Sequence, residues 1–215
     1  SYIDDTELLV NRRRTANAEV GLTYKYLFDQ ASLDVDLGYR RGIGWRGAEE
    51  DYPSASHGGL TLRPTITTLS AVYDQPMNLA GSPFRYTLSL RSQFTRDLTL
   101  SVDQFAIGSR YSVRGFDGDS VLLAESGFSV RNDLAVGLSS INSVNTSVYA
   151  GIDFGRVWGQ SAGALAGNAL AGAALGVRGQ ARSWQFDLSL GTPLYKPEGF
   201  RTLRWNPYCS LTYAY

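Results

Sequence analysis

The sequence predicts an all-β fold, because alternating polarity recurs along the chain and no window longer than about two turns keeps a helical period. In a strand, successive side chains leave the pleated backbone on opposite sides, so a half-buried strand alternates apolar and polar residues. We expect nine strands, at residues 16–27, 32–41, 60–74, 86–96, 128–138, 146–158, 170–179, 184–192 and 207–215.

Each expected strand is identified by the apolar residues that alternate along one of its faces. Residues 16–27, 32–41 and 86–96 give the clearest alternation, and the same pattern returns in the later stretches. In 60–74 the apolar set changes parity near Thr67 and Thr68, which predicts a β-bulge there. The apolar sets of the three clearest strands are Ala16, Ala18, Val20, Leu22, Tyr24 and Tyr26; Leu33, Val35, Leu37 and Tyr39; and Tyr86, Leu88, Leu90 and Phe94.

The lengths of the strands and of their connections favour a transmembrane barrel. Most of the stretches reach the roughly 9–11 residues that a tilted membrane strand needs. Short and long connections alternate, as in outer-membrane barrels, with 28–31 short, 42–59 long and 97–127 very long. The connection 75–84, at about ten residues, fits this alternation least well. A soluble β-sandwich remains the alternative, because alternation alone does not say which face is wet.

Aromatic residues near the strand ends favour the membrane, where such residues form girdles at both interfaces. They are Tyr24, Tyr26, Tyr39, Tyr73, Tyr86, Trp158, Trp184, Tyr213 and Tyr215.

Composition excludes several classes of function. Lys and Arg total 20 and Asp and Glu total 20, so the chain lacks the basic excess of a nucleic-acid binder. The chain has a single histidine, His57, and a single cysteine, Cys209. These are too few for a histidine-rich zinc site and argue against a Cys-His nucleophile pair. We therefore expect no enzyme, no cofactor and no metal site. No run approaches 18 apolar residues, and no signal peptide opens the sequence.

The most informative segment is the long connection 97–127. It contains the apolar residues Ile107, Tyr111, Val113 and Phe116, so we do not expect a solvated tip. Long ordered loops in compact folds are usually functional. Its central motif is Val113, Arg114, Gly115 and Phe116.

This motif resembles the signature of the sixth extracellular loop in BamA-like outer-membrane proteins. Its wider context, 105–119 followed by 131–134, is similar to the two-partner secretion transporters called TpsB. Segments 2–7, 12–16, 39–42, 151–155 and 197–200 resemble that family in the same order. A lone Arg-Gly-Phe would be weak evidence, whereas the ordered set is specific.

The resemblance implies a barrel of about sixteen strands, of which residues 1–215 supply the C-terminal nine. The signal peptide, the POTRA domains and the early strands would then lie outside this chain. Loop 97–127 would fold into the lumen, where Arg114 pairs with Asp153 of the wall motif Gly151, Asp153 and Gly155. The two glycines would let the loop approach the wall closely.

The same inner face is expected to carry lumen charges at Arg131, Asp133, Arg178 and Asp187, either as a conduit lining or as charges that neutralise each other. Leu211, Tyr213 and Tyr215 resemble the terminal signal that the barrel-assembly machinery recognises, although that signal more often ends in Phe. The Ala- and Gly-rich stretch 159–176 is interpreted as weak packing at a loop and strand start.

The function implied by the resemblance is secretion of a large TpsA-type exoprotein, such as an adhesin, a haemolysin or a contact-dependent toxin, across the outer membrane of a Gram-negative bacterium. Outer-membrane lipids and lipopolysaccharide would be further partners. A BamA-like insertase and a soluble β-sandwich binding module are the alternatives.

Overall fold

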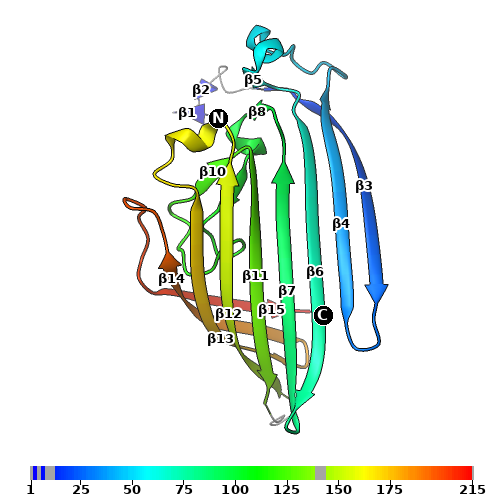
Figure 1. Ribbon diagram of the computed structural model, residues 1–215, viewed down its shortest axis with the longest axis vertical. Helices are drawn as coiled ribbons and strands as arrows, with labels where there is room; N and C mark the ends of the chain where they lie inside the picture. Colours follow the sequence, from blue (N-terminus) through cyan, green and yellow to red (C-terminus); the bar gives the residue numbers. More distant parts are fainter. Residues whose placement is uncertain (1, 4–5, 8–12, 139–143, 215) are drawn as a thin grey trace.

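A curved nine-stranded antiparallel sheet forms the body of the molecule (Figure 1). The computed structural model describes residues 2–3, 6–7, 13–138 and 144–214. Within the sheet each strand pairs with the next one along the chain, so the sheet is a simple up-and-down meander. Its strands are β3 (Ala16–Leu27), β4 (Ser32–Ile43), β6 (Thr65–Leu79), β7 (Ser82–Phe94), β11 (Ser126–Gly137), β12 (Val144–Trp158), β13 (Ala169–Ala181), β14 (Trp184–Tyr195) and β15 (Asn206–Tyr213).

The all-β prediction is confirmed, and each of the nine expected stretches overlaps one strand of the sheet. In such a meander alternate connections lie at the same end of the sheet. The short turns 28–31, 80–81 and 182–183 therefore share one end, and the longer connections lie at the other (Figure 1). In outer-membrane barrels the long loops are extracellular. We use that convention for the two ends.

Two sequence predictions around β6 are wrong. The register of β6 against β4 and β7 runs through Thr67 and Thr68 without a shift, so there is no bulge at that point. The strand begins only at Thr65. The apolar set changes parity because Ile66, near the start of the strand, is buried on the inner face, whereas Leu69 and Tyr73 lie on the outer face. The register shift that does occur lies between Ala171 and Gly172.

The expected ten-residue connection 75–84 is also wrong. It is a two-residue turn in which Ala80 has φ 52° and Gly81 has φ 80°. Two left-handed residues form the turn type that matches the twist of a hairpin. The strands therefore continue to Leu79 and from Ser82, and Pro76 and Pro83 lie within them.

Burial in the sheet is the inverse of that in a soluble protein. Along β12, Ile152 is 62% exposed, whereas Asp153 is fully buried. The alternation continues at Phe154 and Gly155, the apolar residue being exposed and its neighbour buried. An apolar outer face with a polar inner face is the pattern of a membrane barrel and not of a sandwich.

The hydrophobic core lies inside the curve of the sheet and is supplied mainly by the loop between β7 and β11. The shorter elements are β1 (Tyr2–Ile3), β2 (Thr6–Glu7), η2 (Pro53–His57), β5 (Leu60–Thr61), β8 (Leu98–Thr99), η3 (Ser101–Asp103), β9 (Phe105–Ile107), β10 (Leu122–Ala124) and η4 (Ser161–Ala164). In the part of the chain that the structure describes, no helix is long and apolar enough to cross a membrane.

The orientation of the two faces predicts opposite effects of an added charge. Ile152→Lys on the lipid face of β12 should destabilise the folded barrel by about 2–4 kcal/mol, because lysine at mid-membrane depth loses its hydration. Ser210→Lys, whose residue pairs with Asp187 on the lumen face of β15, is the matched control and should be nearly neutral. Urea unfolding of the full-length protein in lipid vesicles measures both. Equal destabilisation by the two variants would contradict the assignment of the faces.

Candidate functional site

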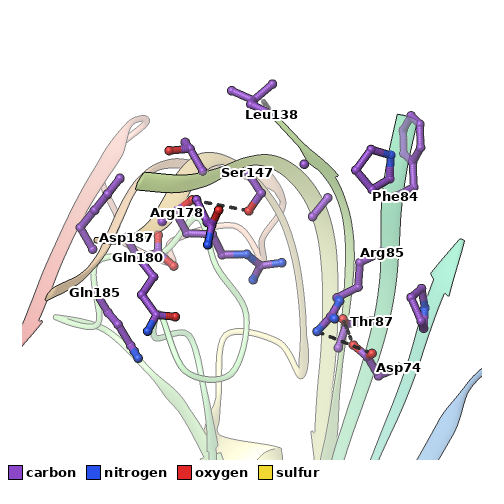
Figure 2. A pocket seen from close by; sticks show the side chains of 18 of the residues that line it. Asp74, Phe84, Arg85, Thr87, Leu138, Ser147, Arg178, Gln180, Gln185 and Asp187 are labelled. Atoms are coloured by element: carbon purple, nitrogen blue, oxygen red, sulfur yellow. Dashed lines mark hydrogen bonds and ion pairs between the residues drawn. The ribbon is translucent and has the colours of Figure 1, made fainter. Parts of the chain in front are cut away.

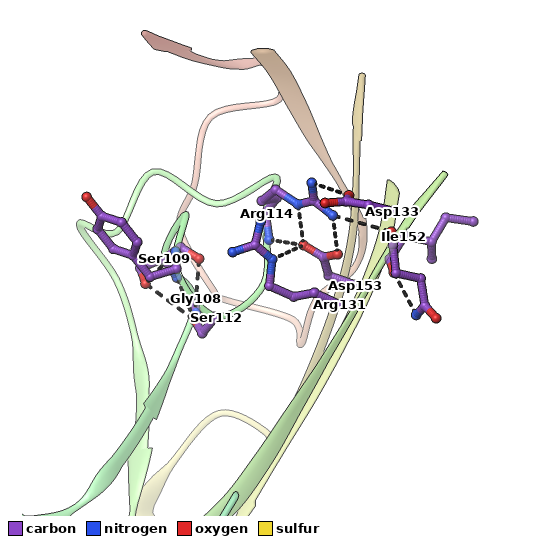
Figure 3. A network of polar contacts seen from close by, with 10 residues as sticks. Gly108, Ser109, Ser112, Arg114, Arg131, Asp133, Ile152 and Asp153 are labelled. Atoms are coloured by element: carbon purple, nitrogen blue, oxygen red, sulfur yellow. Dashed lines mark hydrogen bonds and ion pairs between the residues drawn. The ribbon is translucent and has the colours of Figure 1, made fainter. Parts of the chain in front are cut away.

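The candidate site is the place where the tip of loop 97–127 meets the inner wall of the sheet. Strands β9 and β10 pair with each other and form a short stem that carries the tip, residues 108–121, inward. At the start of the tip, the Ser112 hydroxyl accepts hydrogen bonds from the backbone N–H groups of Gly108 and Ser109, at 3.1 and 3.2 Å. This local turn precedes Arg114, whose side chain points toward the wall (Figure 3).

The centre of the contact is an ion pair between Arg114 of the loop and Asp153 of β12 (Figure 3). Arg114 Nε donates to Asp153 Oδ2 at 2.7 Å, and Nη2 donates to Oδ1 at 2.6 Å. The backbone N–H of Arg114 also donates to Oδ2, at 2.9 Å. The carboxylate therefore fixes both the side chain and the main chain of a single loop residue, in the bidentate geometry that gives arginine its directional specificity.

Two further charges complete the cluster. Arg114 Nη1 lies 2.6 Å from Asp133 Oδ1 on β11, and Arg131 Nε lies 3.8 Å from Asp153 Oδ2. Two arginines thus face two aspartates, and the cluster is formally neutral. Burial on its own lowers the pKa of Arg114, but the hydrogen bonds and charges of Asp153 and Asp133 outweigh burial and raise it. Arg114 consequently stays charged at any physiological pH.

Glycines allow the loop to lie directly against the wall. A Cβ on Gly151 would lie 2.3 Å from Arg114 Nη2, and one on Gly155 would lie 2.9 Å from Val113 Cγ2. These are the two glycines that the sequence motif suggested. They leave room on both sides of Asp153, so that the guanidinium and the neighbouring valine reach the wall.

The sequence reasoning missed two more glycines in this contact. A Cβ on Gly172 of β13 would lie 1.8 Å from the Arg114 carbonyl oxygen, and one on Gly191 of β14 would lie 2.7 Å from Gly115 N. Gly115 itself has φ 99° and packs against the carbonyl of Thr192. The interpretation of 159–176 as weak packing is therefore wrong at Gly172, where the missing side chain makes room for the loop.

Phe116, at the end of the motif, is fully buried in the hydrophobic core. Its ring meets that of Phe200 edge to face, with 5.6 Å between centroids. Tyr111, which was expected to be sheltered as well, is 67% exposed. The core consists of Phe105, Ile107, Val113, Phe116, Leu122, Ala124, Val157, Leu170 and Phe200.

Polar contacts from β15 and from the loop before it hold the other side of the tip. Asn206 Nδ2 donates to the Gly115 carbonyl at 2.8 Å, and the Tyr208 hydroxyl donates to the Phe116 carbonyl. Asp117 accepts from the backbone N–H of Leu203 at 3.0 Å. These groups were not predicted, because nothing local in their sequence marks a partner about 90 residues away.

A second buried carboxylate, Glu125, fixes the base of the loop. It accepts hydrogen bonds from the Ser161 hydroxyl, from the Ser161 backbone N–H at 3.1 Å and from Gln104 Nε2 at 3.3 Å. Glu125 therefore joins the base of loop 97–127 to the connection between β12 and β13.

The remaining predicted lumen charges, Arg178 and Asp187, connect to the Arg114 cluster through Tyr149, since Arg114 Cζ lies 5.9 Å from the centroid of the Tyr149 ring. Arg178 stacks on the ring of Tyr149 at 4.8 Å, and the Tyr149 hydroxyl donates to Asp187 at 2.8 Å. Both charged residues line a cavity of about 800 Å³ near the short-turn end of the sheet, together with Asp74 and Arg85 (Figure 2). Side chains of both charge signs thus line this part of the inner face.

The predicted terminal signal lies on the outer face of β15. Leu211 and Tyr213 are 64% and 55% exposed, and Tyr213 packs against Trp184 with 4.9 Å between ring centroids. Tyr215 lies outside the described residues. Among the residues described, no group of three or more His, Cys, Asp or Glu side chains is arranged to hold a metal ion.

The chain resembles known proteins that are described as secretion or transporter proteins. Residues 1–179 match the family described as haemolysin secretion/activation protein ShlB/FhaC/HecB. The chain is 39% identical over 208 residues to the outer membrane transporter CdiB-2 of Burkholderia pseudomallei, covering 95% of this chain and 35% of that protein. It is 25% identical over 157 residues to the hemolysin transporter protein HpmB of Proteus mirabilis, covering 73% and 28%.

Among solved structures, CdiB from Acinetobacter baumannii matches with a TM-score of 0.81 and 27% identity, covering 98% of this chain and 35% of that one. CdiB from Escherichia coli has the same fold, with a TM-score of 0.86, 24% identity and coverage of 98% and 38%. The chain thus spans about a third of the length of the first relatives it matches.

The contact at Gly172 predicts how the loop responds to an added side chain. Gly172→Val should displace the loop tip at a cost of about 1–3 kcal/mol, since overpacking a filled site forces the backbone apart. Gly163→Val is the matched control, because nothing lies within 4 Å of a Cβ at Gly163. Limited proteolysis of loop 97–127 in the folded barrel should be faster in the first variant only. Equal cleavage of both variants would refute the close contact.

Proposed function

The chain belongs to the haemolysin secretion/activation family of ShlB, FhaC and HecB, and on that premise we propose that it forms the C-terminal part of an outer-membrane transporter barrel. The barrel lies in the outer membrane of a Gram-negative bacterium. Its cargo is a large TpsA-type exoprotein, in the class of haemolysins, adhesins and contact-dependent toxins, which passes through the lumen to the cell surface.

The observation that carries this proposal is the fixed loop inside a polar lumen. A segment tied to the wall by Arg114 and Asp153 occupies the space through which a chain would pass. A buried pair of this kind adds little net stability, because desolvation offsets much of the attraction. Its value lies in holding the loop at one position. The position of the loop then determines whether the lumen is open to the cargo.

The lining of the lumen suits a polypeptide better than an ion. Arg178, Asp187, Arg85 and Asp74 present both signs of charge around the cavity near the short turns. A ring of one sign would select ions of the other sign. Mixed charges with polar neighbours instead let a chain of any sequence slide past without a strong binding site.

The alternative function is a BamA-like insertase that folds other barrels. The Arg-Gly-Phe motif is common to both groups and does not separate them. Two relatives that cover 95% and 92% of this chain are named outer membrane transporters, which favours export. Catalysis has no part in the proposal, since the polar groups at the site pair with one another and fix a loop.

The test is secretion by the Arg114→Ala variant of the full-length transporter. Removing one partner of a buried ion pair costs about 3–5 kcal/mol, so the loop should lose its position and secretion should fall about tenfold or more. The barrel should still assemble, because the nine-stranded pairing does not involve the loop tip. Cargo in the medium measures secretion, and heat-modifiable migration in detergent measures assembly.

Arg110→Ala is the matched control. Arg110 lies four residues earlier in the same loop and stacks on Tyr111 and Tyr208. Its loss should leave secretion near the wild-type level. Wild-type secretion by Arg114→Ala would refute the role of the ion pair. Unchanged secretion combined with a general loss of other outer-membrane proteins would favour the insertase.

A further inference from the structure

The outer face of the sheet carries very few charges, and those it carries have one sign. Along the described strands of the nine-stranded sheet, the outward positions hold two charged residues, Arg41 on β4 and Arg156 on β12. Arg156 is exposed between the buried Gly155 and Val157, and it pairs across the sheet with outward-facing Phe128. Arg41 is exposed and pairs with Ala18. Acidic residues on these strands point to the lumen.

Both arginines lie at the extracellular end. Arg41 precedes Ile43, the last residue of β4, by two positions, and Arg156 precedes Trp158, the last residue of β12, by two. A charge at the middle of the lipid face costs about 2–4 kcal/mol, whereas one at the interface costs about 0–1. Their position therefore places both guanidinium groups in the headgroup layer of the outer leaflet.

A third arginine joins them just beyond the end of β7. Arg96 is exposed and continues the outward alternation of Phe94. The backbone N–H of Thr65 donates to Asp97 Oδ2 at 2.7 Å, so this segment lies beside Thr65. Thr65 in turn pairs with Arg41. Arg41 and Arg96 thus flank Thr65 at two strand spacings, or about 10 Å between their backbones.

Several lumen-side arginines have a carboxylate partner, and the three outward arginines have none among the described residues. In the described part of the chain, the ion pairs of Arg40, Arg85, Arg114 and Arg131 are all with aspartates on the lumen side. None of the ion pairs there involves the three outward arginines. Within the described residues, their guanidinium groups are therefore available to a counter-charge from outside the protein.

Aromatic rings mark the same level. Phe128 lies 5.8 Å from Phe154 and 6.2 Å from Trp158, measured between ring centroids, and this cluster surrounds Arg156 on the lipid face. Aromatic side chains gather where the hydrocarbon meets the headgroups. The arginine therefore lies beside the anchor that sets the membrane boundary.

We propose that Arg41, Arg96 and Arg156 bind the phosphate groups of lipopolysaccharide in the outer leaflet. Guanidinium groups bind phosphate in a planar, bidentate geometry and are more weakly hydrated than ammonium groups. The spacing of Arg41 and Arg96 suits a headgroup that bears more than one phosphate, whereas a glycerophospholipid offers one. The site anchors and orients the barrel, independently of what the barrel transports.

The test measures binding of purified lipopolysaccharide to the full-length transporter in detergent. The triple variant Arg41→Gln, Arg96→Gln and Arg156→Gln should bind at least about tenfold more weakly than the wild type, equivalent to about 1.4 kcal/mol. Heat-modifiable migration shows that the variant barrel is folded.

The matched control removes three arginines from other places. Arg85 and Arg91 face the lumen from β7, and Arg182 lies in the turn at the opposite end of the sheet. The control triple variant to Gln has the same net charge and should bind as the wild type does. Equal weakening in both triple variants would show a general charge effect and overturn the site.

Two further ligands test the chemistry on the unaltered protein, so that the outcome does not depend on any variant folding. Dephosphorylated lipopolysaccharide should bind the wild type at least about tenfold more weakly than the intact form. Equal binding of the two forms would overturn the proposal. Phosphatidylglycerol should bind weakly and equally to the wild type and to the outward triple variant. Binding of it as tight as that of lipopolysaccharide, and lost in that variant, would assign the site to phospholipid instead.

Discussion

The Asp153 carboxylate is the constraint on which the inner architecture depends. It is fully buried on the wall, so its charge must be neutralised by a group brought to it. The loop provides that group as Arg114, whose side chain and backbone N–H both donate to the carboxylate. Because three donors from one residue converge on two oxygen atoms, the direction of the chain at Arg114 is fixed as well as its position. Phe116 is thereby carried into the core, two residues further on.

The depth of the loop is set by side chains that are missing from the wall. Gly151 and Gly155 on β12, Gly172 on β13 and Gly191 on β14 all face the loop at distances that a Cβ would violate. At this level of the lumen, three adjacent strands therefore expose backbone that no side chain covers. The ion pair alone would allow a larger distance between the loop backbone and the wall, since an arginine side chain is long and flexible. The glycines remove that freedom, because the loop backbone itself lies against the strands.

The fold was predictable because its signal is local, whereas much of the site was not. A period of two is visible within ten residues, and it located all nine strands of the sheet. The boundaries failed around Pro76 and Pro83, which are typical of loops but lie here near the end of a hairpin. Arg114 and Asp153 were found through motifs that resemble a family. Gly172 and Asn206 were not predicted, because each contacts a backbone carbonyl of the loop that is far away in sequence.

The balanced composition follows from where the charges lie. Inside the sheet, a basic residue facing an acidic one leaves little net field, as Arg114 and Asp153 or Lys25 and Asp34 do. Such balance suits the proposed passage of a protein, because a strong field of one sign would retain segments of the other sign. On the outer face the hydrocarbon excludes charge except at its borders. There Arg156 has no ion-pair partner among the described residues, and in our proposal the phosphate groups of the outer leaflet supply the opposite charge.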